Sequence, residues 1–215
     1  HTFGGWYENE DFSGESVTKI STTDTEDKTY YAKWTINQYT VTFVSDGQVV
    51  GTQTVNYGEG ATAPEVTKPG YTLTWDKDFS RVTGDMTVTA KWTAKTDTAY
   101  QVEHYQQNTS LDGYDIVTQD TENKTGTTGE TVTATAKTYT GFRHNESHSE
   151  RVESGEVAGD GSLVLKVYYD RENYNVTLNT NGGTIAQGSN VTSYIYGIET
   201  TLPTPTKEGH TFGGW

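Results

Sequence analysis

The sequence predicts a mainly β protein in which several small modules follow one another along the chain. Three observations support this prediction. Apolar and polar residues alternate with period two at 39–43, 86–93 and 162–169, in stretches rich in Thr, Val and Tyr, and these residues favour a half-buried pleated surface. No long stretch has the spacing of an amphipathic helix. Short motifs also recur in the same order at two places in the chain, as in tandem repeat proteins.

The composition favours small cores rather than one large one. Only 31% of the 215 residues are hydrophobic, whereas 15 Tyr and 5 Trp supply wide rings. A few buried rings can supply much of the burial energy of a small module, at about 25 cal/mol per Å² of apolar surface removed from water. The chain has no cysteine, which excludes disulfides, thiolate metal sites and thiol nucleophiles.

The charge of the chain limits its partners. The net charge is −14, and phosphate backbones repel such a chain, so we expect no nucleic-acid partner. No apolar run is long enough to cross a bilayer, so we also expect no membrane insertion. The acidity more simply serves solubility and repulsion between neighbouring modules.

Two segments of the chain share the same order of motifs, and this order predicts the strands in both. Each segment starts with Tyr-x-Val-Thr, at 39–42 and at 174–177, and continues with a glycine-containing turn and a second strand that ends at Tyr-Gly. A proline, a Lys-x-Gly motif and a tryptophan follow in both segments. The first segment then reaches a strand with the motif Ala-Lys-Trp-Thr at 90–93, which recurs at 32–35.

The segment between these repeats has a different pattern. We expect strands at 100–105, 114–117, 130–136 and 162–169, with a linker between the second and the third. Asp112-Gly113 and Asp160-Gly161 mark tight turns, because Asp-Gly readily supplies the positive φ that such turns need.

The motif HTFGGW both opens the chain, at 1–6, and closes it, at 210–215. Joining the two ends through this shared motif recreates a whole repeat. We therefore expect four segments: 1–37 as the second half of a repeat, 38–95 as a complete repeat, 96–171 as a different β module, and 172–215 as the first half of a repeat. The two halves predict unpaired strand edges, which neighbouring repeats or head-to-tail copies would complete.

These motifs resemble two known repeat families. The order Tyr-Thr-Val-Thr-Phe, Tyr-Gly, Pro, Lys-x-Gly, Trp and Ala-Lys-Trp-Thr is similar to the Listeria–Bacteroides repeat, also called the internalin B-type repeat. The segment that begins YQVEHYQQN and ends GSLVLKVYYDR resembles MucBP-like repeats. Both resemblances imply small β-grasp-like modules in a linear array, within a large secreted or wall-anchored bacterial surface protein.

The resemblance implies a non-catalytic function outside the cell. The repeats would act as a stalk or adhesin segment that spaces or presents a binding head. The alternative is a weak binding module for host glycoprotein or polysaccharide that gains affinity through multivalency. An exposed aromatic strip beside a groove would favour this binding role, whereas buried rings would favour the stalk.

The sequence assigns no catalytic, cofactor or metal residue. It lacks the Gly-x-Ser-x-Gly and His-Glu-x-x-His motifs and any phosphate-binding glycine loop. If 144–150 were a strand, His144, Glu146, His148 and Glu150 would share one face as a metal site, but a solvated polar loop is the preferred interpretation. The acidic stretches 8–11 and 24–27 lack the spacing of a calcium-binding loop. We expect them to form a hydrated acidic rim on the surface.

The remaining candidates have structural interpretations. The glycines of HTFGGW predict a bulge with positive φ that turns Phe3 and Trp6 into a core. Trp92 alternates with Val88, so we expect it to be buried as well. His104 alternates with Tyr100 and Val102 and should be semi-buried with its hydrogen bonds satisfied. Five Asn-x-Ser/Thr triplets, which we expect to be unused in a bacterial protein, start at Asn108, Asn123, Asn145, Asn175 and Asn190.

Overall fold

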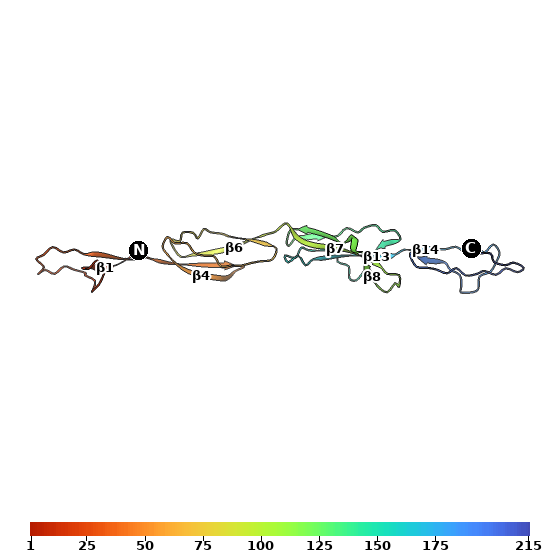
Figure 1. Cartoon of the computed structure of the whole chain (residues 1–215), viewed down its shortest axis with the longest axis horizontal. Helices are drawn as coiled ribbons and strands as arrows, with labels where there is room; N and C mark the ends of the chain where they lie inside the picture. Colours follow the sequence, from red (N-terminus) through yellow and green to blue (C-terminus); the bar gives the residue numbers. More distant parts are fainter. The chain divides into compact units, whose positions relative to one another are not determined.

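The computed structural model describes all 215 residues and is almost entirely β (Figure 1). A single 3-10 turn at Thr118–Asp120 is the only helical element, and no helix could span a membrane. The chain divides into two compact units, His1–Thr93 and Ala94–Trp215, and each is described by itself. The predicted mainly β class with several small sheets is confirmed.

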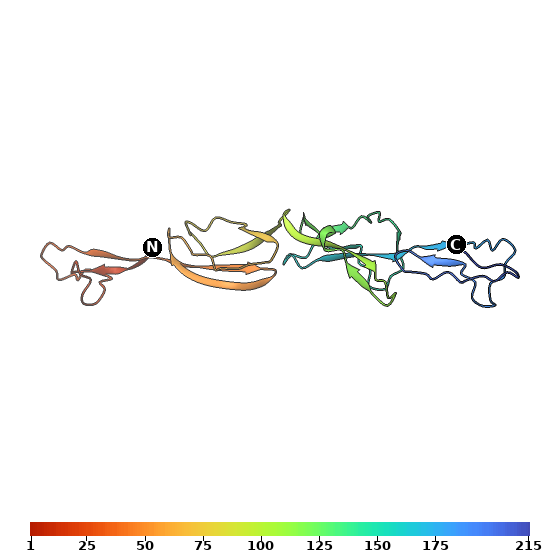
Figure 2. The same ribbon diagram turned by 45° about the vertical axis from the view of Figure 1, so that its right-hand side comes forward.

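Unit 1 contains a four-stranded sheet and a separate two-stranded sheet. Its strands are β1 (Thr2–Tyr7), β2 (Tyr31–Thr35), β3 (Gln38–Ser45), β4 (Gln48–Asn56), β5 (Tyr71–Trp75) and β6 (Met86–Ala94). The large sheet has the order β4-β3-β6-β5, with β3 and β6 parallel. Figure 2 shows the long β3–β4 hairpin in orange, next to β6 in yellow. Asp46 and Gly47 both have positive φ at its two-residue turn, which suits the right-handed twist of the strands.

The four-stranded sheet buries the centre of one face. Val41 and Phe43 alternate along β3 with threonines, and they are 0% and 1% exposed. The Phe43 ring meets the rings of Trp75 and Phe79 edge to face, at centroid distances of 5.2 and 5.3 Å. Trp92 is only partly buried and donates its indole N–H to Ser45 Oγ at 3.2 Å. The predicted aromatic core of this repeat is therefore confirmed, with Trp92 at its margin.

The HTFGGW motif forms strand β1, which pairs with β2 as a small antiparallel sheet. The register shifts between Phe3 and Gly5, and Gly5 has a φ of +117°. The predicted bulge with positive φ is thus confirmed at a position that only glycine adopts without strain.

Unit 2 contains a five-stranded sheet and two small two-stranded sheets. Its strands are β7 (Thr98–Gln107), β8 (Tyr114–Ile116), β9 (Glu122–Gly126), β10 (Thr131–Thr133), β11 (Phe142–His144), β12 (Ser154–Glu156), β13 (Val164–Arg171), β14 (Asn173–Asn175) and β15 (Ser193–Ile195). The large sheet runs β11-β13-β7-β8, and β9 also pairs with β7. Strands β7 and β13 are its long parallel centre. The small sheets pair β10 with β12 and β14 with β15.

The core of unit 2 lies on one face of β7 and β13. Val102 and His104 of β7 and Leu165, Val167 and Tyr169 of β13 are all at most 1% exposed. The alternating apolar residues of these two parallel strands therefore lie on the same face of the sheet, as the sequence pattern predicts.

Two expectations for unit 2 differ from the structure. The stretch expected as a linker contains β9. This edge strand pairs only with β7, and its residues Glu122–Gly126 are polar, so apolar and polar residues do not alternate along it. The strand expected at 130–136 is only Thr131–Thr133, since its partner β12 is equally short. No helix lies on either large sheet. The fold therefore does not confirm the β-grasp form of the modules, which stays a prediction.

Candidate interaction surfaces

Residues 145–150 form turns, as the preferred interpretation of this stretch as a polar loop predicts, and the strand that the metal alternative required ends at His144. His144 lies on β11 and contacts the Glu153 carboxylate. His148 stacks on the ring of Tyr168, and Glu150 accepts a hydrogen bond from the same tyrosine. No group of three or more His, Asp or Glu side chains in the chain is placed to hold a metal ion.

The acidic stretches 8–11 and 24–27 are exposed turns, as expected for a hydrated rim. Asp11 accepts a hydrogen bond from the Ser13 backbone N–H at 2.9 Å, and hydrogen bonds from Ser13 lower the Asp11 pKa. Asp24 accepts a hydrogen bond from the Ser21 backbone N–H at 3.2 Å. These carboxylates therefore stabilise their own turns.

His104 is fully buried, rather than semi-buried as expected, and it belongs to a chain of hydrogen bonds in the core of unit 2. Its Nδ1 lies 2.9 Å from the Tyr169 hydroxyl, which accepts the Lys137 backbone N–H at 2.7 Å. Its Nε2 lies 3.3 Å from Glu122 Oε1. The ionised Glu122 carboxylate can only accept, so His104 Nε2–H donates to it, and Nδ1 of the neutral ring then accepts the Tyr169 hydroxyl hydrogen. The expected satisfaction of this histidine is confirmed.

Burial holds His104 neutral, and neighbouring ammonium groups hold the Glu122 carboxylate ionised. Burial lowers the pKa of His104, although its hydrogen bond to Glu122 opposes the shift. The Lys124 ammonium, 2.7 Å from Glu122, leads the interactions that lower the Glu122 pKa to about 2. The cluster is closed to solvent at the histidine, so we interpret it as structural rather than catalytic.

The opposite face of the unit 2 sheet carries a cluster of aromatic rings that alternation along the sequence did not single out. The Tyr168 ring is stacked between Tyr105, at 4.9 Å, and His148, at 3.8 Å, with an interplanar angle of 14° in both pairs. Tyr114 meets Tyr168 edge to face at 5.2 Å. Tyr168 and Tyr169 are adjacent in the sequence and therefore point to opposite faces of β13. The consecutive tyrosines were the available signal for this second aromatic face.

A hollow of about 320 Å³ opens beside these rings. Its lining consists of Tyr105, Asp112, Gly113, Tyr114, His148, Ser149, Glu150 and Tyr168. Aromatic faces with a few convergent polar groups are typical of small-molecule sites. We call this feature the tyrosine hollow.

The two-stranded sheet of unit 1 leaves its rings half exposed, so the expectation that they turn into a core is wrong there. Phe3, Trp6 and Trp34 are 45%, 47% and 59% exposed. Phe3 contacts both tryptophan rings edge to face, at 5.6 and 5.4 Å. Two strands cannot cover three large rings, because an isolated hairpin has no second layer.

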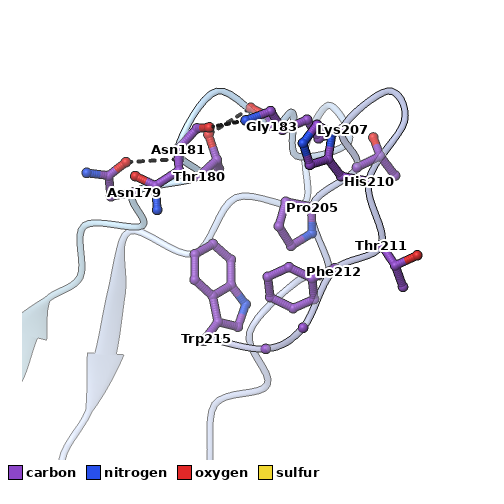
Figure 3. Close-up of a pocket in the computed structure, with 13 residues that line it drawn as sticks. Asn179, Thr180, Asn181, Gly183, Pro205, Lys207, His210, Thr211, Phe212 and Trp215 are labelled. Atoms are coloured by element: carbon purple, nitrogen blue, oxygen red, sulfur yellow. Dashed lines mark hydrogen bonds between the residues drawn. The ribbon is translucent and has the colours of Figure 1, made fainter.

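The C-terminal segment of unit 2 has a similar open aromatic surface. Trp215 and Phe212 are 49% and 37% exposed and lie 5.4 Å apart. Figure 3 shows both rings beside Pro205, at a hollow of about 250 Å³ that is also lined by the turn at 179–183. The Trp215 indole N–H donates to the Pro203 carbonyl at 2.8 Å. This indole is thus held in place while much of its ring remains in solvent.

Arg171 connects the five-stranded sheet of unit 2 to the segment that follows. Its guanidinium donates to the carbonyls of Asn108, at 3.0 Å, and Tyr196, at 2.9 Å. It also lies over the Phe142 ring, 4.9 Å from the centroid. Sequence reasoning missed this residue, because its partners are backbone atoms brought close only by the fold. We call these contacts the Arg171 joint.

The chain matches a known family over most of its length. Residues 1–33, 39–103 and 174–215 match the family model of the Listeria–Bacteroides repeat domain. Two relatives from Evansella cellulosilytica, provisionally named a membrane protein and a Gly-rich membrane protein, are 28% and 30% identical over the whole chain. The chain spans 34% of the first relative and 25% of the second.

A solved structure is also similar in part. It contains domains 3–4 of the Streptococcal High Identity Repeats in Tandem from a cell surface protein, with 16% identity and a TM-score of 0.24. The match covers 63% of this chain and 98% of that one. On the family match, which covers well over half of its residues, the chain belongs to the Listeria–Bacteroides repeat domain family.

Proposed function

We propose that the chain is a non-catalytic spacer of a bacterial cell-surface protein, in which consecutive β modules hold a binding domain at a distance. Membership of a repeat-domain family and the membrane-protein names of the relatives support this role. The modules would be those of the sequence prediction, with 38–95 complete, 96–171 a MucBP-like module, and 1–37 and 172–215 as halves. Each module would have a β-grasp-like form.

The Arg171 joint is the observation that carries this proposal. Only Glu172 separates β13 from β14, and the Glu172 backbone N–H donates to the Gly141 carbonyl at 2.8 Å. The Phe142 and Tyr196 rings meet edge to face at 5.8 Å across the same joint. A spacer needs junctions that resist bending, and a partly buried guanidinium with several partners supplies such resistance.

Replacing Arg171 with alanine should loosen this joint without unfolding the five-stranded sheet. The change removes two charge-assisted hydrogen bonds, each contributing about 1.5–3 kcal/mol. Residual dipolar couplings of the full chain should fit one alignment tensor for 98–171 and 173–215 in the wild type, and two in Arg171→Ala. The matched control is Arg143→Ala, since Arg143 is largely exposed and forms only a 3.7 Å ion pair with Asp170. Two independent tensors in the wild type would contradict the spacer role.

We also propose that the open aromatic surfaces of 1–37 and 172–215 are completed by each other in a second copy of the chain. The complete repeat supplies the template, because its β3 runs parallel to β6 with Thr42 opposite Thr87. The shared motifs place Thr177 at the position of Thr42, and Thr29 at that of Thr87. In this register the apolar side chains of the two halves would meet in one core, as Phe43 meets Trp75 in the complete repeat, with Leu178 at the position of Phe43.

Cysteine cross-linking tests this pairing directly, since the chain has no cysteine of its own. A Thr177→Cys chain mixed with a Thr29→Cys chain should give a disulfide-linked heterodimer on mild oxidation, in several-fold excess over homodimers. Paired strand residues lie within the Cα separation that disulfides accept. A Thr42→Cys chain is the control, because β6 already occupies that edge. Equal cross-linking of Thr29→Cys to both partners would contradict the register.

One observation favours a second role, weak multivalent binding of a glycan or glycoprotein. The tyrosine hollow is an aromatic surface with carboxylates at its rim, as expected for a binding module rather than an inert spacer. Repetition along a surface protein would convert a weak site into useful avidity.

A further inference from the structure

The tyrosine hollow is fixed in shape by hydrogen bonds between hydroxyls and carboxylates. Tyr105 donates to Glu103 at 2.5 Å, and Tyr114 donates to Asp170 at 2.6 Å. Burial, followed by these hydrogen bonds, raises the pKa of both tyrosines. The hydroxyls therefore remain protonated donors at neutral pH, and the rings keep their orientation without a ligand. A site prepared in this way loses little conformational entropy on binding.

The rim of the hollow carries uncompensated negative charge. Asp112 and Glu150 line it, and neither forms an ion pair with a lysine or arginine. No lysine or arginine belongs to the lining at all. The Asp112 carboxylate accepts a hydrogen bond from the Asn108 amide at 2.8 Å, and Glu150 accepts the Tyr168 hydroxyl at 3.3 Å. Each carboxylate keeps an oxygen that can accept a further donor.

Ring faces and carboxylates select the same kind of ligand. An aromatic face carries negative electrostatic potential and attracts an ammonium group within about 6 Å of its centroid. The chain already shows this preference, since the ammonium of Lys68 lies 4.9 Å from the Tyr71 centroid. The ammonium of Lys166 lies 5.9 Å from the Tyr105 centroid, so within the hollow the ligand would use the other rings. Carboxylates add Coulomb attraction for a cation and repel an anion.

We propose that the tyrosine hollow binds an organic ammonium group presented on a sugar-sized ligand, such as an amino sugar. The half-buried rings of Tyr114 and His148 would contact the ligand, since Tyr168 is 3% exposed and is covered by the stacked rings of Tyr105 and His148. Glu150 and Asp112 would accept the ammonium and hydroxyl hydrogens of the ligand. The 320 Å³ of the hollow accommodates a monosaccharide unit rather than a longer chain. The inference rests on the second role proposed above and is independent of the spacer role.

Titration of the full chain with monosaccharides tests this site. Glucosamine should shift the NMR signals of Tyr105, Tyr114 and His148 with a dissociation constant in the millimolar range, as expected for one small polar ligand. Glucose should bind at least fivefold more weakly because it lacks the ammonium, and glucuronate should not bind. Tetramethylammonium should compete with glucosamine, and 1 M salt should weaken binding because it screens charges at a partly exposed site.

A conservative substitution separates recognition from folding. Glu150→Gln should weaken glucosamine binding about tenfold and leave the spectrum of the buried core unchanged. The matched control is Glu130→Gln, an exposed carboxylate in a turn of the same unit, which should bind as the wild type does. Equal affinity for glucose and glucosamine would overturn the ammonium preference while leaving a glycan-binding role. Unchanged hollow signals with every probe would overturn the site, and neither result would affect the spacer role.

Discussion

Replacing Phe43 with alanine should remove most of the stability of the four-stranded sheet of unit 1. The ring is 1% exposed and contacts the rings of Trp75 and Phe79 as well as the valines of the same core. Phe→Ala changes in such cores cost about 3–5 kcal/mol, because they lose apolar burial and leave a cavity. A module of this size has only about 5 kcal/mol of total stability, so the change removes most of it.

Amide NMR spectra of the full chain measure this outcome by region. In a urea series, the signals of 38–94 should unfold at a much lower urea concentration in Phe43→Ala than in the wild type, while those of 98–171 should unfold as before because they belong to a separate unit. Val49→Ala is the matched control on the same sheet, since Val49 is 64% exposed, and it should cost less than about 0.5 kcal/mol. A Phe43→Ala chain whose 38–94 signals unfold at the wild-type urea concentration would show that the sheet is held by something other than this ring cluster.

Acidification should destabilise the five-stranded sheet of unit 2 through His104 and Glu122. Burial holds the folded pKa of His104 below its unfolded value of 6.5, so below pH 6.5 the unfolded chain binds a proton that the folded chain excludes. Stability is therefore complete above pH 6.5 and decreases as the pH falls, by at most about 1.4 kcal/mol per pH unit for one proton. Glu122, with its folded pKa lowered from 4.5 to about 2, adds a second loss between those values.

Urea unfolding of the full chain at a series of pH values measures this dependence. His104→Gln keeps an amide that can hydrogen-bond but cannot gain a proton, so it should flatten the loss below pH 6.5 and leave the loss below pH 4.5. His104→Ala should cost about 3 kcal/mol at pH 7, because it leaves a cavity and leaves the Tyr169 hydroxyl hydrogen without its acceptor. His210→Gln, at an exposed position, is the control. A His104→Gln chain with the wild-type pH profile would assign the acid sensitivity to other groups.

The sequence was sufficient to predict the long central strands of both large sheets and some of their turns, but not the edge strand β9 or the short extent of β10. Alternation placed Val41 and Phe43 of β3 and Leu165 and Val167 of β13 on buried faces, because the side-chain period of a strand is two whatever surrounds it. Asp46-Gly47 and the Gly5 bulge were equally predictable, since positive φ is a local property of the backbone. Repetition of motifs pointed to the family that the comparison then established.

The tertiary structure alone decided which surfaces are open and which groups meet. The Arg171 joint depends on the carbonyls of Asn108 and Tyr196, 63 and 25 residues away in the chain. The tyrosine hollow requires a turn at 145–150 to bring His148 onto Tyr168 across the sheet. The sequence by itself determined what each strand presents to its two faces, because that choice is local. Contacts over long sequence separations depend on which elements cover each sheet. The burial of His104 and the exposure of Trp34 therefore follow only from the tertiary structure.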